Sequence, residues 1–219
     1  MKFNIQKELI IIIIALTPLA YLLYFWNTYP DTVPLHWNIK GEVDRMGSKE
    51  NLILIPFLLP VLCYFVLTVA PLIDPKGKLS QMGDKYFNIK FLLTLLMSAL
   101  ALYILNSAKT QNNTNLNFVT VLIGLLFLLF GNYFQALKHN YFIGIRTPWT
   151  LNSEWVWKKT HSLAGKLWVV GGLCILCAGF VLNSTLNFIV FCIISGILVL
   201  IPLIYSFILY KKENSPSNH

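Results

Sequence analysis

The run LNFIVFCIISGILVLIPLIYSFILY, residues 186–210, is the longest apolar stretch of the chain and contains no charged side chain. A helix needs about 20 mostly apolar residues to cross the hydrocarbon core of a bilayer. This run therefore predicts a membrane-spanning helix. Five more stretches of this kind precede it, at residues 9–27, 52–71, 89–106, 117–137 and 163–182. The sequence thus predicts an all-α, polytopic integral membrane protein with six transmembrane helices.

The overall composition agrees with a membrane protein. The 219 residues are 56% hydrophobic and 12% charged, whereas about 25% of the residues in an ordinary soluble domain are charged. A soluble fold with so few charges would expose large apolar patches, which monomers rarely tolerate. The composition excludes a soluble domain, a disordered chain and a DNA-binding module. We expect the lipid bilayer as a partner and no direct contact with nucleic acid.

The positive charges are distributed unevenly between the predicted loops. The side that holds the N-terminus, the second and fourth loops and the tail carries 12 Lys and Arg, and the opposite side carries 4. Because Lys and Arg collect in cytoplasmic loops, this asymmetry predicts an N-in/C-in orientation. No Asp or Glu falls inside a predicted span, which argues against proton-coupled transport.

Three spans fall in each half of the chain, so the sequence predicts two units. Residues 1–110 form an N-terminal half with an outer loop at 28–51, and residues 111–219 form a C-terminal half with a cytoplasmic loop at 138–162. Halves of opposite topology occur in some transporters. A transporter or channel for a small solute or a peptide is therefore an alternative function.

The outer loop contains YPDTVPLHWNIKGEVDR, residues 29–45. Its two prolines favour extended backbone, and the glycine allows a turn. One histidine near carboxylates could bind a divalent ion, but it falls short of the usual ligand set. We expect no metal, and we expect the histidine and tryptophan to pack at the membrane interface. The candidate binding residues of this loop are His36, Trp37, Asn38, Gly41 and Asp44.

The cytoplasmic loop ends in a predicted helix. Asn152 or Ser153 is a suitable N-cap for a helix that begins at Glu154, where an acidic side chain favours the helix dipole. Trp157 and His161 would then share a face of that helix, because they are four residues apart.

Arg146-Thr147-Pro148-Trp149 precedes that helix and predicts a rigid turn. Its guanidinium could bind an acidic group or stack on Trp149. The alternative is an interfacial anchor, in which Trp, Tyr and Lys side chains fix the depth of the flanking helices.

Signatures of enzymes are scarce. We find no nucleophile elbow, no zinc-protease motif and no glycine loop for phosphate, so we expect a non-enzymatic protein without cofactors. A metal-dependent membrane hydrolase would have to use His36, His139 and His161. The predicted topology puts His36 on the opposite side of the membrane from the other two.

The two loops together resemble one family. The C-terminal half is similar to the signature of the bacterial SdpI family of membrane immunity proteins, and the outer loop resembles the domain of unknown function that commonly precedes it. The residues that carry the first resemblance are Gly131-Asn132-Tyr133, Asn140, GIRTPWTL at 144–151, Ser153, Trp157, Thr160-His161 and Gly165. Those that carry the second are Pro30, Val33-Pro34, His36-Trp37-Asn38, Gly41 and Asp44, with Ile73-Asp74-Pro75-Lys76 after the second span.

The resemblance implies a location in the bacterial cell membrane and a role in toxin resistance. Members protect the producing cell from a secreted, membrane-active peptide of the sporulation-delaying type, although paralogues without a toxin operon exist. In the best-known system the immunity protein also senses the toxin and holds a transcriptional autorepressor at the membrane. A peptide toxin and a cytoplasmic repressor are the implied partners. The candidate signalling residues are Asn140, Gly144, Arg146, Thr147, Pro148, Trp149, Trp157 and His161.

Overall fold

The computed structural model describes residues 5–111 and 115–215. Six helical segments in this part of the chain are long and apolar enough to cross a membrane, which confirms the predicted fold class. The second segment, Lys49–Ile73, joins short turns of different helix types, including a π-helical turn at Phe57–Val61. The helices are α1 (Ile5–Tyr24), α2 (Leu54–Pro56), α3 (Leu62–Ile73), α4 (Asp84–Thr110), α5 (Leu116–Phe134), α6 (Pro148–Asn152), α7 (Glu154–Val181) and α8 (Ser184–Glu213), and the strands are β1 (Thr32–Trp37) and β2 (Val43–Ser48).

Several helices extend beyond the apolar stretches that predicted them. Helix α7 starts at Glu154, so the last part of the predicted loop 138–162 is helical. Helix α1 starts at Ile5, so Glu8, which precedes the predicted span, lies inside a helix. The reason is physical: an apolar run marks what the bilayer covers, whereas a helix continues until a cap ends it.

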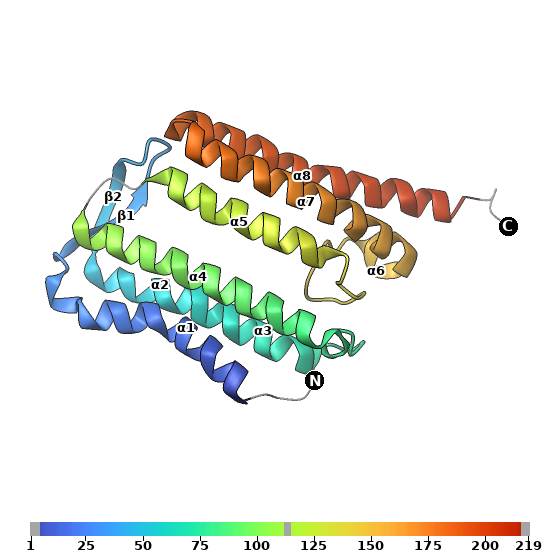
Figure 1. Ribbon diagram of the computed structural model, residues 1–219, viewed down its shortest axis with the longest axis horizontal. Coiled ribbons are helices and arrows are strands. Elements are labelled where there is room, and N and C mark those ends of the chain that lie inside the picture. The colour runs from blue at the N-terminus through green and yellow to red at the C-terminus, as the bar shows by residue number, and fades with distance from the viewer. Residues whose placement is uncertain (1–4, 112–114, 216–219) are drawn as a thin grey trace.

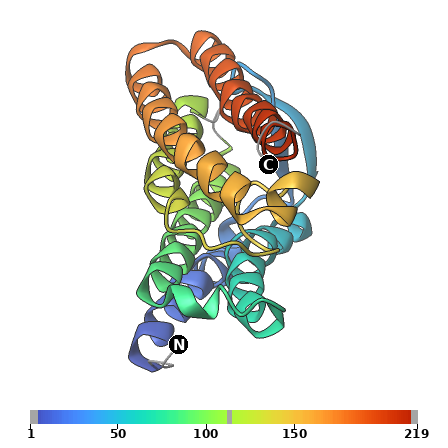
Figure 2. The ribbon, with the colours of Figure 1, turned by 90° about the vertical axis from the view of Figure 1, so that its right-hand side faces the viewer.

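The long helices lie side by side with the β-hairpin at one end (Figure 1). The short helix α6, the start of α1 and the end of α8 lie at the opposite end (Figure 1). Helix α4 packs against α1 and α3, and α7 packs against α5 and α8, while α4 also contacts α5 (Figure 2). The predicted division of the chain at residues 110 and 111 and the predicted orientation in the membrane stay predictions.

Helices α5 and α7 approach so closely that their backbones touch. A Cβ atom on Gly131 would lie 2.8 Å from the carbonyl oxygen of Gly165, and one on Gly172 would lie 2.5 Å from the amide nitrogen of Leu128. Small residues at helix interfaces allow such packing within a membrane, where apolar burial alone does not hold helices together.

Polar side chains connect α5 to α8 at the hairpin end. The side-chain nitrogen of Asn187 donates hydrogen bonds to Asn117 Oδ1 at 3.0 Å and to Thr120 Oγ1 at 2.6 Å. Asn117 and Asn187 thus hydrogen-bond to each other between helices α5 and α8.

A buried ion pair connects α1 to α4. Lys90 Nζ lies 2.6 Å and 2.8 Å from the two carboxylate oxygens of Glu8, and Tyr64 donates its hydroxyl to the same carboxylate at 3.2 Å. Glu8 is 4% exposed and Lys90 is 2% exposed. Since each charge has lost its water, each depends on its partner.

Candidate functional site

Asn140 organises the loop between α5 and α6. Its side-chain nitrogen donates to the carbonyl oxygens of Lys138 at 2.7 Å and Ile143 at 3.1 Å, and its side-chain oxygen accepts from the amides of Phe142 at 2.7 Å and Ile143 at 2.8 Å. The side chain is fully buried. Asn140 therefore replaces the hydrogen bonds that a helix or sheet would provide to this loop.

His161 fastens the loop to α7. The amide of Ile145 donates to His161 Nε2 at 3.0 Å, so Nδ1 carries the proton and donates to the carbonyl oxygen of Trp157 at 2.8 Å. The imidazole also stacks on the Trp157 ring, with a centroid distance of 4.0 Å, which confirms their predicted common face. Because both ring nitrogens have partners, His161 has none free for a metal.

Gly144 makes this contact possible. Its φ of +116° is a conformation that side chains disfavour, and a Cβ atom there would lie 2.4 Å from His161 Nε2. A glycine at this position is therefore required by both the backbone and the histidine.

Thr147 begins helix α6 in a capping box. Its hydroxyl accepts from the amide of Thr150 at 3.2 Å, while the Thr150 hydroxyl accepts from the amide of Thr147 at 2.8 Å. Pro148 occupies the first helical turn, which suits its fixed φ. The predicted rigid turn is thus the start of a short helix.

Helix α6 docks on α8 through Trp149, whose indole nitrogen donates to the Ser206 hydroxyl and whose ring lies 5.2 Å from that of Phe207. Arg146 instead donates from Nη1 to the carbonyl oxygen of Tyr141 at 2.6 Å and is exposed. Ser153 caps α7 by accepting from the amide of Val156 at 3.1 Å, so it is Ser153 that fills the predicted N-cap position.

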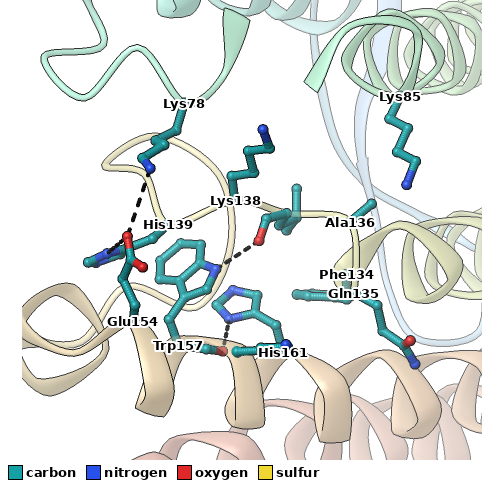
Figure 3. Close-up of a pocket in the computed structure, with 12 residues that line it drawn as sticks. Lys78, Lys85, Phe134, Gln135, Ala136, Lys138, His139, Glu154, Trp157 and His161 are labelled. Carbon is teal, nitrogen blue, oxygen red and sulfur yellow. Dashed lines mark hydrogen bonds and ion pairs between the residues drawn. The ribbon is translucent and has the colours of Figure 1, made fainter. Parts of the chain in front are cut away.

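The loop after α5 and the first turns of α7 form one side of a cavity of about 410 Å³, which we call the basic cavity (Figure 3). Trp157 lies at its floor and donates its indole N–H to the carbonyl oxygen of Leu137 at 2.9 Å. Four lysines and one glutamate make its lining positive. The residues that line it are Lys78, Lys85, Phe134, Gln135, Ala136, Leu137, Lys138, His139, Glu154, Trp157, Lys158 and His161.

His139 lines the basic cavity in surroundings that disfavour its charged form. Burial lowers the pKa of His139, and the Lys76 ammonium, 3.3 Å from its ring nitrogens, lowers that pKa further. The Glu154 carboxylate opposes this effect from 3.8 Å. A neutral imidazole here packs on Trp157, whose ring centroid lies 5.2 Å away.

At the opposite end of the molecule, β1 and β2 form an antiparallel hairpin with an irregularity at His36. His36 Nδ1 lies 2.6 Å from Asp44 Oδ1, and both side chains are largely exposed. The Asn38 side chain accepts from the amides of Lys40 at 2.8 Å and Glu42 at 3.1 Å, so it shapes the turn that Gly41 completes with a φ of +81°. The predicted extended loop with a turn is confirmed.

Trp37 of the hairpin has a buried side-chain nitrogen without a hydrogen-bond partner among the described residues. The hairpin also lies at the opposite end of the molecule from α6 and the loop that precedes it (Figure 1), so His36 cannot share one site with His139 and His161, which line the basic cavity. The shared three-histidine centre considered from the sequence is therefore wrong.

Sequence reasoning missed two parts of this arrangement. Lys78 and Lys85 belong to the connection before α4 and to its first turn, yet they line the basic cavity with the loop after α5. Their positive charge was visible in the sequence, but nothing in it indicated which loop they face. The Glu8–Lys90 pair was missed because Glu8 was assigned to the segment before the first span.

Comparisons with known proteins match both ends of the molecule. Residues 136–206 match the SdpI/YfhL protein family, and residues 13–59 match a domain of unknown function, DUF1648. The chain is 26% identical over 212 residues to the Immunity protein SdpI of Bacillus subtilis (strain 168), an alignment that covers 95% of this chain and 98% of that protein. No solved structure matches.

Proposed function

Because residues 136–206 match the SdpI/YfhL protein family and nearly the whole chain is similar to an immunity protein, we propose that it protects a bacterium from a secreted antimicrobial peptide of the sporulation-delaying type. It is a multi-pass cell membrane protein. The observation that carries the proposal is the similarity to an immunity protein along 95% of the chain, which includes both the hairpin and the loop before α7.

In this proposal the hairpin faces outward and contacts the toxin. Its side chains His36 and Asp44 are exposed, and the half-buried Trp37 follows His36 in β1. A rigid aromatic side chain beside charged groups suits contact with an amphipathic peptide. The bundle beneath the hairpin would contact the apolar part of the toxin.

The opposite end would recruit a cytoplasmic repressor once toxin is bound. Arg146, Lys158 and Lys159 are exposed at this end, and an acidic protein surface would complement them. Asn140, Gly144 and His161 would act indirectly, because they hold the loop that presents Arg146.

Survival of a toxin-sensitive bacterium tests the immunity proposal. Cells that express the chain should survive a challenge with the sporulation-delaying peptide, and cells with the empty vector should not. His36→Ala should lower survival at an equal amount of protein in the membrane. Absence of protection by the correctly inserted parent chain would contradict the proposal.

A reporter under the control of the repressor tests the signalling part. Arg146→Ala should abolish the toxin-dependent response and leave insertion intact, since the side chain is exposed and its hydrogen bond is to the backbone of Tyr141 in the same loop. Lys40→Ala, a loss of one positive charge at the hairpin, is the matched control. If Arg146→Ala kept full repressor recruitment and full protection, the role given to this surface would be wrong.

The carboxylate of Glu8 inside α1 is the observation that favours the transport alternative, because acidic residues within spans often serve ion coupling. Its tight pairing with Lys90 argues for a structural role. Reconstituted vesicles separate the two functions. Flux of labelled peptide that requires the protein would favour transport, and saturable binding without flux would favour sequestration.

A further inference from the structure

The basic cavity collects positive charge from segments that are distant in the sequence. Lys78 and Lys85 come from the connection before α4 and its first turn, Lys138 comes from the loop after α5, and Lys158 comes from α7. Figure 3 shows Lys85 and Lys138 across the cavity from the rings of Trp157 and His161. Bringing four ammonium groups together costs electrostatic energy that an anion would offset.

The lysines are weakly compensated within the protein. Lys78 Nζ lies 3.9 Å from a Glu154 carboxylate that is 72% exposed, and Lys138 Nζ donates to the side-chain oxygen of Gln81 at 3.3 Å. Lys85 and Lys158 have no ion pair or hydrogen bond within residues 5–111 and 115–215. Most of the positive charge is therefore available to a ligand.

The cavity is not uniformly polar. Phe134, Leu137 and Trp157 are nearly fully buried and form its apolar lining beneath the lysines. An inorganic ion would use the lysines alone. An amphiphile with an anionic head and apolar carbon next to it would use both parts of the surface.

A second groove, of about 390 Å³, adjoins the basic cavity. Gln135 lines both, and the groove continues along α5 and α7 past Gly131 and Gly165, where the two helices touch. Val170 at the groove is 61% exposed, so this surface would face lipid. Lys166 also lines the groove, and a lysine within a span is expected to direct its ammonium toward the headgroups.

The cavity lies at the end of the bundle, where headgroups would meet the protein. This is also the end that carries most of the lysines and arginines in the predicted loops, and basic pockets between transmembrane helices on that side are suited to acidic headgroups.

We propose that the basic cavity binds the phosphate headgroup of an anionic phospholipid, with one acyl chain lying in the groove beside Gly131 and Gly165. The bound lipid connects α4 to α7, because Lys85 stands on the first helix and Lys158 on the second. It thus forms part of the contact between the two halves of the chain. This inference does not depend on the toxin or the repressor.

The test measures lipid selectivity of the purified full-length chain. Copies of phosphatidylglycerol and phosphatidylcholine that stay bound are counted by native mass spectrometry after extraction from nanodiscs of equal proportions. The test variant is Lys85→Gln/Lys138→Gln. The matched control, Lys159→Gln/Lys211→Gln, removes the same charge at the same end from residues that do not line the cavity.

We expect the parent and the control to retain phosphatidylglycerol selectively and the test variant to lose about thirtyfold in selectivity. Equal selectivity in the test and control variants would overturn the proposal. Displacement of the lipid by millimolar inorganic phosphate would also overturn it, because the site would then recognise a free anion. If the test variant kept its lipid and instead lost binding of a synthetic acidic peptide, the cavity would be a protein-docking surface.

Discussion

The two ends of the molecule use polar side chains in opposite ways. At the hairpin end, the His36–Asp44 pair lies in solvent and the Asn38 side chain bonds to its own turn. At the basic end, Asn140 and His161 are buried: Asn140 bonds to the backbone of its own loop, and His161 joins that loop to α7. The hairpin is therefore a surface feature, whereas the loop before α7 is an internal framework.

This difference separates two kinds of candidate residue. In the hairpin, His36 and Asp44, two of the residues identified from the sequence, are exposed and available to a partner. At the loop, the side chains of Asn140 and His161 already form hydrogen bonds within the protein, and His161 occupies the space beside Gly144. Arg146 differs because its side chain is exposed. A substitution in the loop before α7 should thus lower the free energy of unfolding, whereas a substitution at the hairpin surface should lower toxin protection alone.

The largest expected effect is at Gly144. Gly144→Ala places a Cβ atom in a conformation of positive φ and against His161 Nε2. We expect a loss of at least about 3 kcal/mol in the free energy of unfolding, because backbone strain adds to the clash. Melting of the purified protein in detergent measures it. Gly196→Ala, where nothing lies within 4 Å of the new atom, is the control. An unchanged melting temperature for Gly144→Ala would remove the basis for calling the loop a framework.

The next effect is at the ion pair near the basic end. Lys90→Met leaves the Glu8 carboxylate buried without its partner, and breaking a buried pair costs about 3–5 kcal/mol. The double variant Glu8→Gln/Lys90→Met should regain much of this loss, because no charge remains buried. Denaturation of the purified variants measures both. Asp84→Asn, where the replaced side chain is 88% exposed in its pair with Lys7, is the control and should change little. A double variant as unstable as Lys90→Met would contradict the explanation.

A smaller effect should appear as a dependence on pH. Burial lowers the pKa of His139 in the folded protein, so the unfolded chain binds a proton here more readily. Stability should therefore fall as the pH drops below about 6.5, the ordinary histidine value. His139→Gln should reduce this fall in melting temperature between pH 7.5 and pH 5.5. A variant that loses as much stability as the parent over that range would show that His139 is not the group responsible.

The smallest effect on stability is expected at the hairpin. Asp44→Asn removes an exposed partner of His36, and such pairs contribute at most about 1 kcal/mol. The melting temperature should stay nearly unchanged while toxin protection falls, which is the reverse of the pattern at Gly144. A large loss of stability would mean that the hairpin, too, is a framework.

Local features of the sequence predicted local features of the structure. The six spans followed from apolar length, and the N-cap at Ser153 and the shared face of Trp157 and His161 followed from helical spacing. The contacts that join distant segments did not follow. Trp149 meets Ser206 and Lys90 meets Glu8 across many residues, and no single helix pattern specifies which helices pack together.

Labelling of single cysteines in intact cells tests most directly the claim that the two ends serve opposite sides of the membrane. Lys40→Cys at the hairpin turn and Lys159→Cys on α7 are exposed positions, and the parent chain gives the background from its own cysteines. A membrane-impermeant maleimide should label Lys40→Cys in intact cells, and Lys159→Cys only after permeabilisation. Labelling of Lys159→Cys alone in intact cells would reverse the orientation and contradict both the outward toxin contact and the cytoplasmic recruitment of a repressor.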